Sequence, residues 1–116
     1  MRSAIKYLNK AALLSISPND YDRRNFLLGA IGIRADGIEI FSRNGNNHER
    51  TRTIHAEYRL MRKGTPGTVV YVARITRDLQ WANAKPCHSC MQSMIRKGVA
   101  KIYYTIAPNE YGTITL

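Results

Sequence analysis

Cysteine is scarce in this chain, which has only Cys87 and Cys90 among its 116 residues. Two thiols are too few for the disulfide framework that stabilises many small secreted domains. The chain also lacks an apolar run long enough to span a bilayer, and Met1-Arg2-Ser3 does not begin a secretory signal. We therefore expect neither a disulfide-rich secreted protein nor a membrane-spanning one, and a reducing, cytoplasmic location fits best.

Acidic residues are also few. Eight Asp and Glu stand against 18 Lys and Arg, so the formal net charge is +10 and the pI is near 10.1. Such a charge on a small protein indicates an anionic partner, either a nucleotide phosphate or a nucleic acid, or serves solubility among polyanions. Many of these cations would also suit a solvated helix face. The basic residues that cluster around the motifs described below are Arg43, Arg50, Arg52, Arg59, Arg62, Lys63, Arg96, Lys97 and Lys101.

The length and the apolar content predict one domain over residues 1–116. A chain of 116 residues with 44% apolar residues can bury a core without disulfides. We find no internal repeat, low-complexity stretch or linker that would divide it.

The first third of the chain predicts a helix followed by a hairpin. Apolar residues recur at helical spacing over residues 3–15. Residues 26–33 and 38–41 are strand-like, and Asp36-Gly37 between them is a strong hairpin turn. The polar composition of residues 42–47 indicates a loop.

The rest of the chain alternates helices and strands. The expected elements are a helix over residues 55–63, a strand over 69–75, a helix over 86–97, and strands over 101–106 and 113–116. The strand at 69–75 is almost continuously apolar, which predicts a central strand covered on both faces. The order predicts a three-layer α/β domain around a five-stranded mixed sheet with an antiparallel final hairpin.

Two short segments contain the residues with metal-binding chemistry. They are His55-Ala56-Glu57 and Pro86-Cys87-His88-Ser89-Cys90. One imidazole and two thiolates suit zinc, and three protein ligands leave a fourth position for water, as in catalytic zinc sites. Cys87 and Cys90 are three residues apart, so on a helix they share one face. A helix N-terminus, which Pro86 predicts here, favours the thiolate form.

Glu57 has a different predicted place. It follows His55 by two residues, so the two side chains do not share a helical face. We therefore expect Glu57 beside the water of the zinc site rather than as a ligand of the same ion.

Two other interpretations of the cysteines remain open. Cys87 and Cys90 could form a disulfide, or a closed structural zinc site could recruit His48 or His88 as its fourth ligand. His88 lies between the two cysteines, where its side chain should point away from their shared face. Both histidines would also suit ordinary surface positions.

H-x-E followed by P-C-x-x-C is the signature of zinc-dependent nucleobase deaminases. Because each motif opens a predicted helix, the chain closely resembles the cytidine deaminase-like fold over essentially its whole length. This resemblance implies that His55, Cys87 and Cys90 bind Zn2+ and that Glu57 transfers protons.

The resemblance also implies contacts with the substrate. Ala56 matches the position whose backbone amide contacts the carbonyl of the base. Asn44, in the loop after the hairpin, is similar to the asparagine that holds the sugar, although Asn46 and Asn47 compete for this role.

Two features resemble different branches of this family. A histidine as first ligand is typical of deoxycytidylate deaminases, tRNA adenosine deaminases and polynucleotide cytosine deaminases. The short connection between the last two strands forces an antiparallel hairpin, which is similar to nucleoside deaminases and toxin-type deaminases. The resemblance therefore leaves the substrate open.

The expected reaction is hydrolytic deamination of cytosine to uracil. Zinc lowers the pKa of bound water towards ~7. Glu57 takes a proton from this water and passes protons to N3 and to the leaving ammonia. We expect a free (deoxy)cytidine nucleoside or nucleotide such as dCMP as substrate, with Arg43, Arg50 or Arg52 at its 5′-phosphate.

The alternative substrate is single-stranded DNA or RNA. The net charge of +10 favours it, and Trp81 and Tyr111 are predicted in loops flanking the pocket, where they could stack bases. Deamination of adenine and a non-catalytic zinc module that binds nucleic acid are further alternatives. Family members often associate, so we also expect a homo-oligomer.

Overall fold

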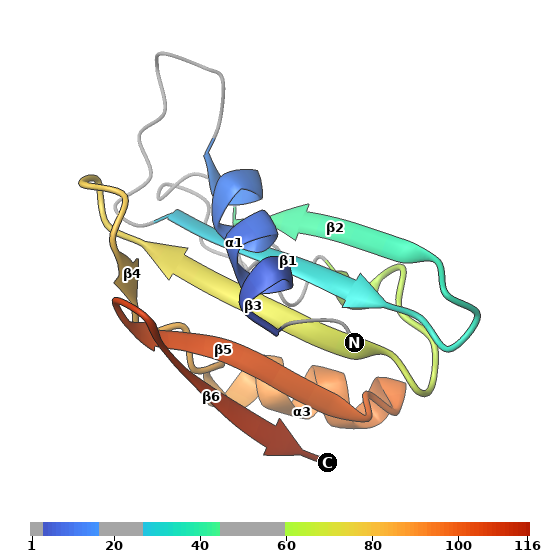
Figure 1. Ribbon diagram of the computed structural model, residues 1–116. Helices are drawn as coiled ribbons and strands as arrows, with labels where there is room; N and C mark the ends of the chain where they lie inside the picture. Colours follow the sequence, from blue (N-terminus) through green and yellow to red (C-terminus); the bar gives the residue numbers. More distant parts are fainter. Residues whose placement is uncertain (1–3, 17–26, 45–59) are drawn as a thin grey trace.

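The computed structural model describes residues 4–16, 27–44 and 60–116 (Figure 1). They form two helices, one on each face of a six-stranded sheet. The elements are α1 (Ala4–Ser15), β1 (Leu27–Ile33), β2 (Glu39–Arg43), β3 (Val69–Ile75), β4 (Trp81–Ala82), α3 (His88–Lys97), β5 (Lys101–Ala107) and β6 (Glu110–Thr115). In this part of the chain, neither helix is long and apolar enough to cross a membrane.

The sheet is mixed, as predicted. Its strand order is β2-β1-β3-β5-β6, with the short β4 paired to the end of β3. Among the described strands, only β3 and β5 run parallel, whereas β1 pairs antiparallel with both β2 and β3. The final hairpin of β5 and β6 is antiparallel, which confirms that prediction.

The sequence analysis missed one strand and shortened another. β4 brings the number of strands to six instead of five, and it comprises only Trp81 and Ala82, opposite Ile75 and Arg74 of β3. Two residues are too short for a periodic signal, so the pairing of the main chain alone defines this strand. β6 begins at Glu110 rather than at residue 113, because a turn of two residues suffices before it.

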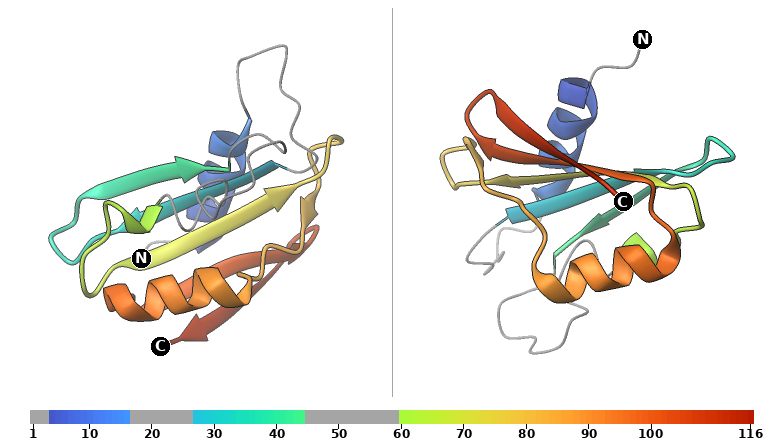
Figure 2. Two further views of the ribbon diagram at one scale, coloured as in Figure 1. Left: turned by 180° about the vertical axis from the view of Figure 1, so that it is seen from behind. Right: turned by 90° about the horizontal axis from the view of Figure 1, so that it is seen from below.

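The sheet separates two apolar layers, with α1 on one face and α3 on the other (Figure 2). Alternate residues of β3 point to opposite faces. Val70 and Val72 belong to the core on the α3 side, and Tyr71 and Ala73 to the core on the α1 side. The prediction that this strand is covered on both faces is therefore confirmed.

α1 lies unusually close to β1. A Cβ atom at Gly29 would overlap the main-chain carbonyl oxygen of Ala11, so only glycine permits this approach. The helix buries its apolar stripe against the sheet, including Tyr7, Leu8 and Ala12. The expected amphipathic helix over residues 3–15 is thus confirmed within the described range.

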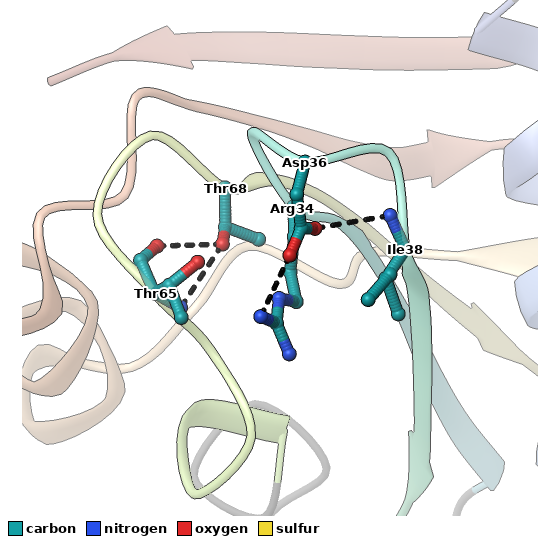
Figure 3. Close-up of polar contacts among 5 residues, drawn as sticks. All are labelled: Arg34, Asp36, Ile38, Thr65 and Thr68. Carbon is teal, nitrogen blue, oxygen red and sulfur yellow. Dashed lines mark hydrogen bonds and ion pairs between the residues drawn. The ribbon is translucent and has the colours of Figure 1, made fainter.

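Tight turns close the end of the sheet at which β1 ends and β3 begins (Figure 3). In the β1–β2 turn, Asp36 Oδ1 accepts from the Ile38 N–H at 3.2 Å and Gly37 has φ +87°. In the turn before β3, Thr68 Oγ1 donates to the Thr65 carbonyl at 2.6 Å and accepts from the Thr65 N–H at 3.2 Å. Asp36-Gly37 therefore forms the predicted hairpin turn.

Two helix ends lie at or near their predicted positions. Leu60 and Met61 are helical and belong to the core beneath α3, but the helix expected over residues 55–63 ends at Met61, two residues earlier than predicted. α3 ends at Gly98, whose φ is +78°. The Val99 N–H donates to the Met94 carbonyl at 3.0 Å, which with the bond from Gly98 to Ile95 forms a Schellman motif.

Gly29→Ala tests the contact between α1 and β1. We expect the free energy of unfolding to fall by about 1–3 kcal/mol or more, because backbone atoms of α1 and β1 must move apart to admit a methyl group. Urea denaturation measures this change. Gly64→Ala is the control, because its nearest added contact is the Met61 side chain at 3.4 Å, and it should cost much less. Equal stability of both variants would contradict the close approach.

Candidate active site

The candidate active site lies at the edge of the sheet where β3 and β5 end. Carboxyl ends of parallel strands open onto the same edge, and ligands of α/β proteins commonly bind there. Because Leu27 of β1 pairs with Ile75 of β3, the end of β2 reaches this edge as well. The chain leaves β3 here, forms β4 and enters α3 (Figure 1). The structure thus brings Asn44 and the segment with the two cysteines to one end of the molecule.

The two cysteines lie at the start of α3. Cys87 is the N-cap residue, with φ −69° and ψ 167°, and Cys90 lies within the first turn of the helix. The helix therefore begins two residues later than Pro86 predicted. Cys87 is exposed and Cys90 is only 2% exposed, and no disulfide joins them in this structure.

The two cysteines have different surroundings, polar and exposed for Cys87 and apolar and buried for Cys90. The Cys87 sulfur lies 3.4 Å from Ser89 Oγ. His88 is exposed at the first position of α3, as expected for a residue between two ligands. Cys90 instead packs into the core with Met94 and Ala84, which holds its position. The Cys87 thiol is thus at the surface, and the Cys90 thiol is part of the core beneath it.

The donor set fits zinc. Two thiols at one helix N-terminus are soft ligands of the kind that bind this ion. Across the residues that the structure describes, no three His, Cys, Asp or Glu side chains gather as a metal site. The two thiols thus need a further ligand, the role that the sequence analysis assigns to His55. His55, Ala56 and Glu57 lie outside the described residues.

Thr105 connects the strands at this edge with the segment that leads to the cysteines. The parallel pairing ends at Val72 and Tyr104, beyond which β3 and β5 part. Here the buried Thr105 hydroxyl accepts from the Arg74 N–H at 3.1 Å and donates to the Ala82 carbonyl at 2.7 Å.

The main chain of Thr105 adds a third bond at the same place. Its carbonyl accepts from the Ala84 N–H at 2.9 Å. The chain between β4 and α3 is therefore held by one residue of β5 through both its side chain and its main chain. Sequence reasoning missed Thr105, because a threonine in a strand is ordinary and only the parting of the strands gives it this role.

Asn44 is buried directly after β2, with 4% of its surface exposed. Its Oδ1 accepts from the Leu28 N–H and its own N–H donates to the Leu28 carbonyl, both at 3.0 Å. Ile40 and Leu28 belong to the core on the α3 side, so strand alternation places Asn44 on that face as well. Asn44 thus shares both the end and the face of the sheet with Cys90. Its competitors Asn46 and Asn47 lie outside the described residues.

The basic residues predicted to bind a 5′-phosphate are less favourably placed than Asn44. Arg43 adjoins Asn44, but strand alternation turns it to the α1 face. Lys10 of α1 confirms which residues of β2 face that side, because it pairs with Glu39 at 2.7 Å and lies 5.4 Å from the Phe41 ring. Arg50 and Arg52 lie outside the described residues.

The prediction that Trp81 and Tyr111 flank the pocket is wrong. Trp81 packs on the α1-side core, and Tyr111 extends a row of rings on the same face. In this row the centroids of Tyr7 and Tyr71, and of Tyr71 and Tyr103, are 4.9 Å apart, and Tyr111 follows at 6.2 Å from Tyr103. Both residues therefore lie across the sheet from α3.

The comparisons agree with this arrangement. Residues 1–106 match the family described as the cytidine and deoxycytidylate deaminase zinc-binding region. The chain belongs to this family. Among solved structures, it is similar to the cytidine deaminase from Burkholderia pseudomallei, with a TM-score of 0.74 and 19% identity, over 98% of this chain and 93% of the other. No curated protein matches it.

Membership confirms two parts of the sequence analysis. The mixed α/β sheet is that of the cytidine deaminase fold. Zn2+ is the cofactor that the family implies, and cytidine deamination is its general activity. Cys87 and Cys90, the soft donors that the sequence analysis assigns to this ion, lie at the start of α3.

Thr105→Val tests how this deaminase domain holds the segment before α3. The change keeps the volume but leaves the Arg74 N–H and the Ala82 carbonyl without the hydroxyl, so the free energy of unfolding should fall by about 1–3 kcal/mol. Urea denaturation measures it. The exposed Thr113→Val in the neighbouring strand is the control and should stay within about 0.5 kcal/mol. A loss no larger than in this control would contradict the role of Thr105.

Substitution of the cysteines tests the zinc site. Cys87→Ser and Cys90→Ser should each lose the zinc that the wild-type chain retains through dialysis against a chelator, because a hydroxyl is a much poorer ligand for zinc than a thiolate. Elemental analysis gives the zinc content, and circular dichroism checks that the chain is folded. His88→Ala, between them, should keep its zinc. Retention of zinc by folded Cys87→Ser would refute its assignment as a ligand.

Proposed function

We propose that this deaminase acts on a free (deoxy)cytidine nucleoside or nucleotide such as dCMP, converting cytosine to uracil. One observation carries the proposal: the cysteine pair and buried Asn44 meet at one end and on one face of the sheet. A nucleoside bound there would have its base at the cysteine end of α3 and its sugar beside Asn44. The general activity of the family, cytidine deamination, fits the same place.

We assign the residues as follows. His55, Cys87 and Cys90 would hold the ion, which when bound makes water acidic enough to react at neutral pH. Glu57 takes a proton from that water and delivers protons to N3 of the base and to the departing amine. The balance is one water consumed and one ammonia released for each cytosine converted.

The remaining contacts orient the nucleoside. The Ala56 main-chain N–H would donate to the base carbonyl. Asn44 has its Oδ1 turned to the Leu28 N–H at 3.0 Å, so its amide nitrogen is the group that would donate to a sugar hydroxyl.

Asn44→Ala should then raise the KM for cytidine in steady-state assays, and an unchanged KM would contradict this contact.

The position of the aromatic residues supports a monomeric substrate over a strand. Bases of a bound strand need exposed rings beside the catalytic pocket. Trp81 is instead packed against the core on the α1 side, and Tyr111, although 41% exposed, lies on that same face beside Tyr103. Single-stranded DNA or RNA remains the alternative substrate on account of the net charge of +10.

Glu57→Ala tests the chemistry and the substrate together. The variant should bind zinc like the wild type but release no ammonia, because water loses its proton acceptor. Ammonia release is measured with cytidine, deoxycytidine, dCMP and a single strand containing cytosine. We expect the wild-type chain to turn over the monomers at least tenfold better than the strand.

Controls separate the possible failures of this experiment. Glu110→Ala removes an exposed carboxylate from β6 and should leave turnover unchanged. Turnover of the strand alone would establish the alternative substrate. Full activity of Glu57→Ala with zinc bound would contradict the assigned role of this residue.

A further inference from the structure

A cavity of about 300 Å³ lies between the segment after the helical residues Leu60 and Met61 and the second half of α3. Among the described residues, its lining consists of Met61, Arg62, Ser93, Arg96 and Lys97. None of these residues was assigned to the deaminase centre. The cavity is therefore a separate feature of the face that α3 covers.

The cavity lies away from the cysteines along the same helix. Arg96 follows Cys87 by nine residues, and a helix rises ~1.5 Å per residue, so the two positions are on the order of 14 Å apart. Cys87 marks the edge where β3 and β5 end, whereas the turn after Lys97 leads to the start of β5. A ligand in the cavity would thus not occupy the cysteine end of the helix.

The positive charge in this cavity has no ion-pair partner among the described residues. Arg62, Arg96 and Lys97 are exposed, and no ion pair in the described ranges involves any of them. The C-terminal dipole of α3 favours Arg96 and Lys97, but it does not explain Arg62, which comes from a different segment. Like charges from two segments around one cavity repel each other, and a bound anion would relieve this repulsion.

The polar side chains of the lining can supply the donors that a phosphate group needs. Met61 and Ser93 are 3% and 8% exposed and form the buried part, while the three cations are exposed around them. Arginine guanidinium groups donate in a planar fork that fits phosphate oxygens, and lysine adds a point charge. A serine hydroxyl supplies one more donor.

We propose that this cavity is a phosphate-binding site, separate from the deaminase centre. Its phosphate comes either from the backbone of a single strand or from a free nucleotide or polyphosphate. The proposal does not depend on which base the chain deaminates, because binding at the cavity requires no turnover.

Two double variants with equal charge test it. Arg96→Gln with Lys97→Gln removes two cations from the cavity. Lys6→Gln with Lys10→Gln removes two exposed cations from α1, on the opposite face of the sheet. Both doubles lower the net charge by the same amount, so a difference between them reports position rather than overall charge.

Binding is measured by calorimetry with pyrophosphate and by fluorescence anisotropy with a labelled single-stranded oligonucleotide. We expect the cavity double to weaken binding of at least one ligand tenfold or more, and the α1 double to weaken it less than threefold. Arg62→Gln, from the other wall, should weaken the same ligand. For the strand, the slope of log K against log salt should also fall by ~1.4 in the cavity double, ~0.7 for each lost contact.

The outcomes separate the sources and the failures. If the cavity double binds both pyrophosphate and the strand more weakly, the ligand is the phosphate group itself. If it binds only the strand more weakly, the ligand is the backbone of the strand. Equal weakening by both doubles, or no weakening by the cavity double, overturns the proposal. Deamination of cytidine, which has no phosphate, should be unchanged in the cavity double, so a failure of the proposed function would show in the wild type instead.

Discussion

The parting of β3 and β5 is the constraint on which the site depends. Where the two strands run parallel, their main-chain N–H and carbonyl groups bond to each other. Beyond Val72 and Tyr104 this pairing ends. Buried N–H and carbonyl groups must find other partners. β4 pairs with the end of β3, and the Thr105 hydroxyl bonds to the main chain of both. The segment after β4 thereby leads to the face opposite α1, where α3 starts at the cysteines.

The two faces of the sheet have different contents for the same geometric reason. Alternation along each strand sends successive side chains to opposite sides. On the α1 side, Tyr7, Tyr71 and Tyr103 stack with centroids 4.9 Å apart, and such pairs stabilise a fold by about 0.5–1.5 kcal/mol beyond their burial. On the α3 side, Cys90 and Asn44 occupy one end. The stacked tyrosines thus belong to the packing of one face, and Cys90 and Asn44, which we propose for the site, lie on the other.

The basic side chains of the two faces differ in whether they have a carboxylate partner. Lys10 is paired with Glu39 and Arg34 with Asp36, both on exposed surface, where such pairs contribute little to stability. Arg62, Arg96 and Lys97 instead surround one cavity without a carboxylate partner in the described part of the chain. α3 therefore has two thiols at its start and, at its end, two cations that form no ion pair with the described residues. One helix connects the deaminase centre with the proposed phosphate site.

The sequence by itself determined the family, the zinc cofactor that the family implies, and the order of the long elements, because motifs and apolar periodicity are local. It also predicted the antiparallel final hairpin, since a short connection permits no other. Only the tertiary structure decided β4, the role of Thr105, the faces of Trp81 and Tyr111, and the meeting of Arg62 with α3. These depend on pairings between distant segments and on which side of a strand a residue falls, and a shift of one residue reverses that side.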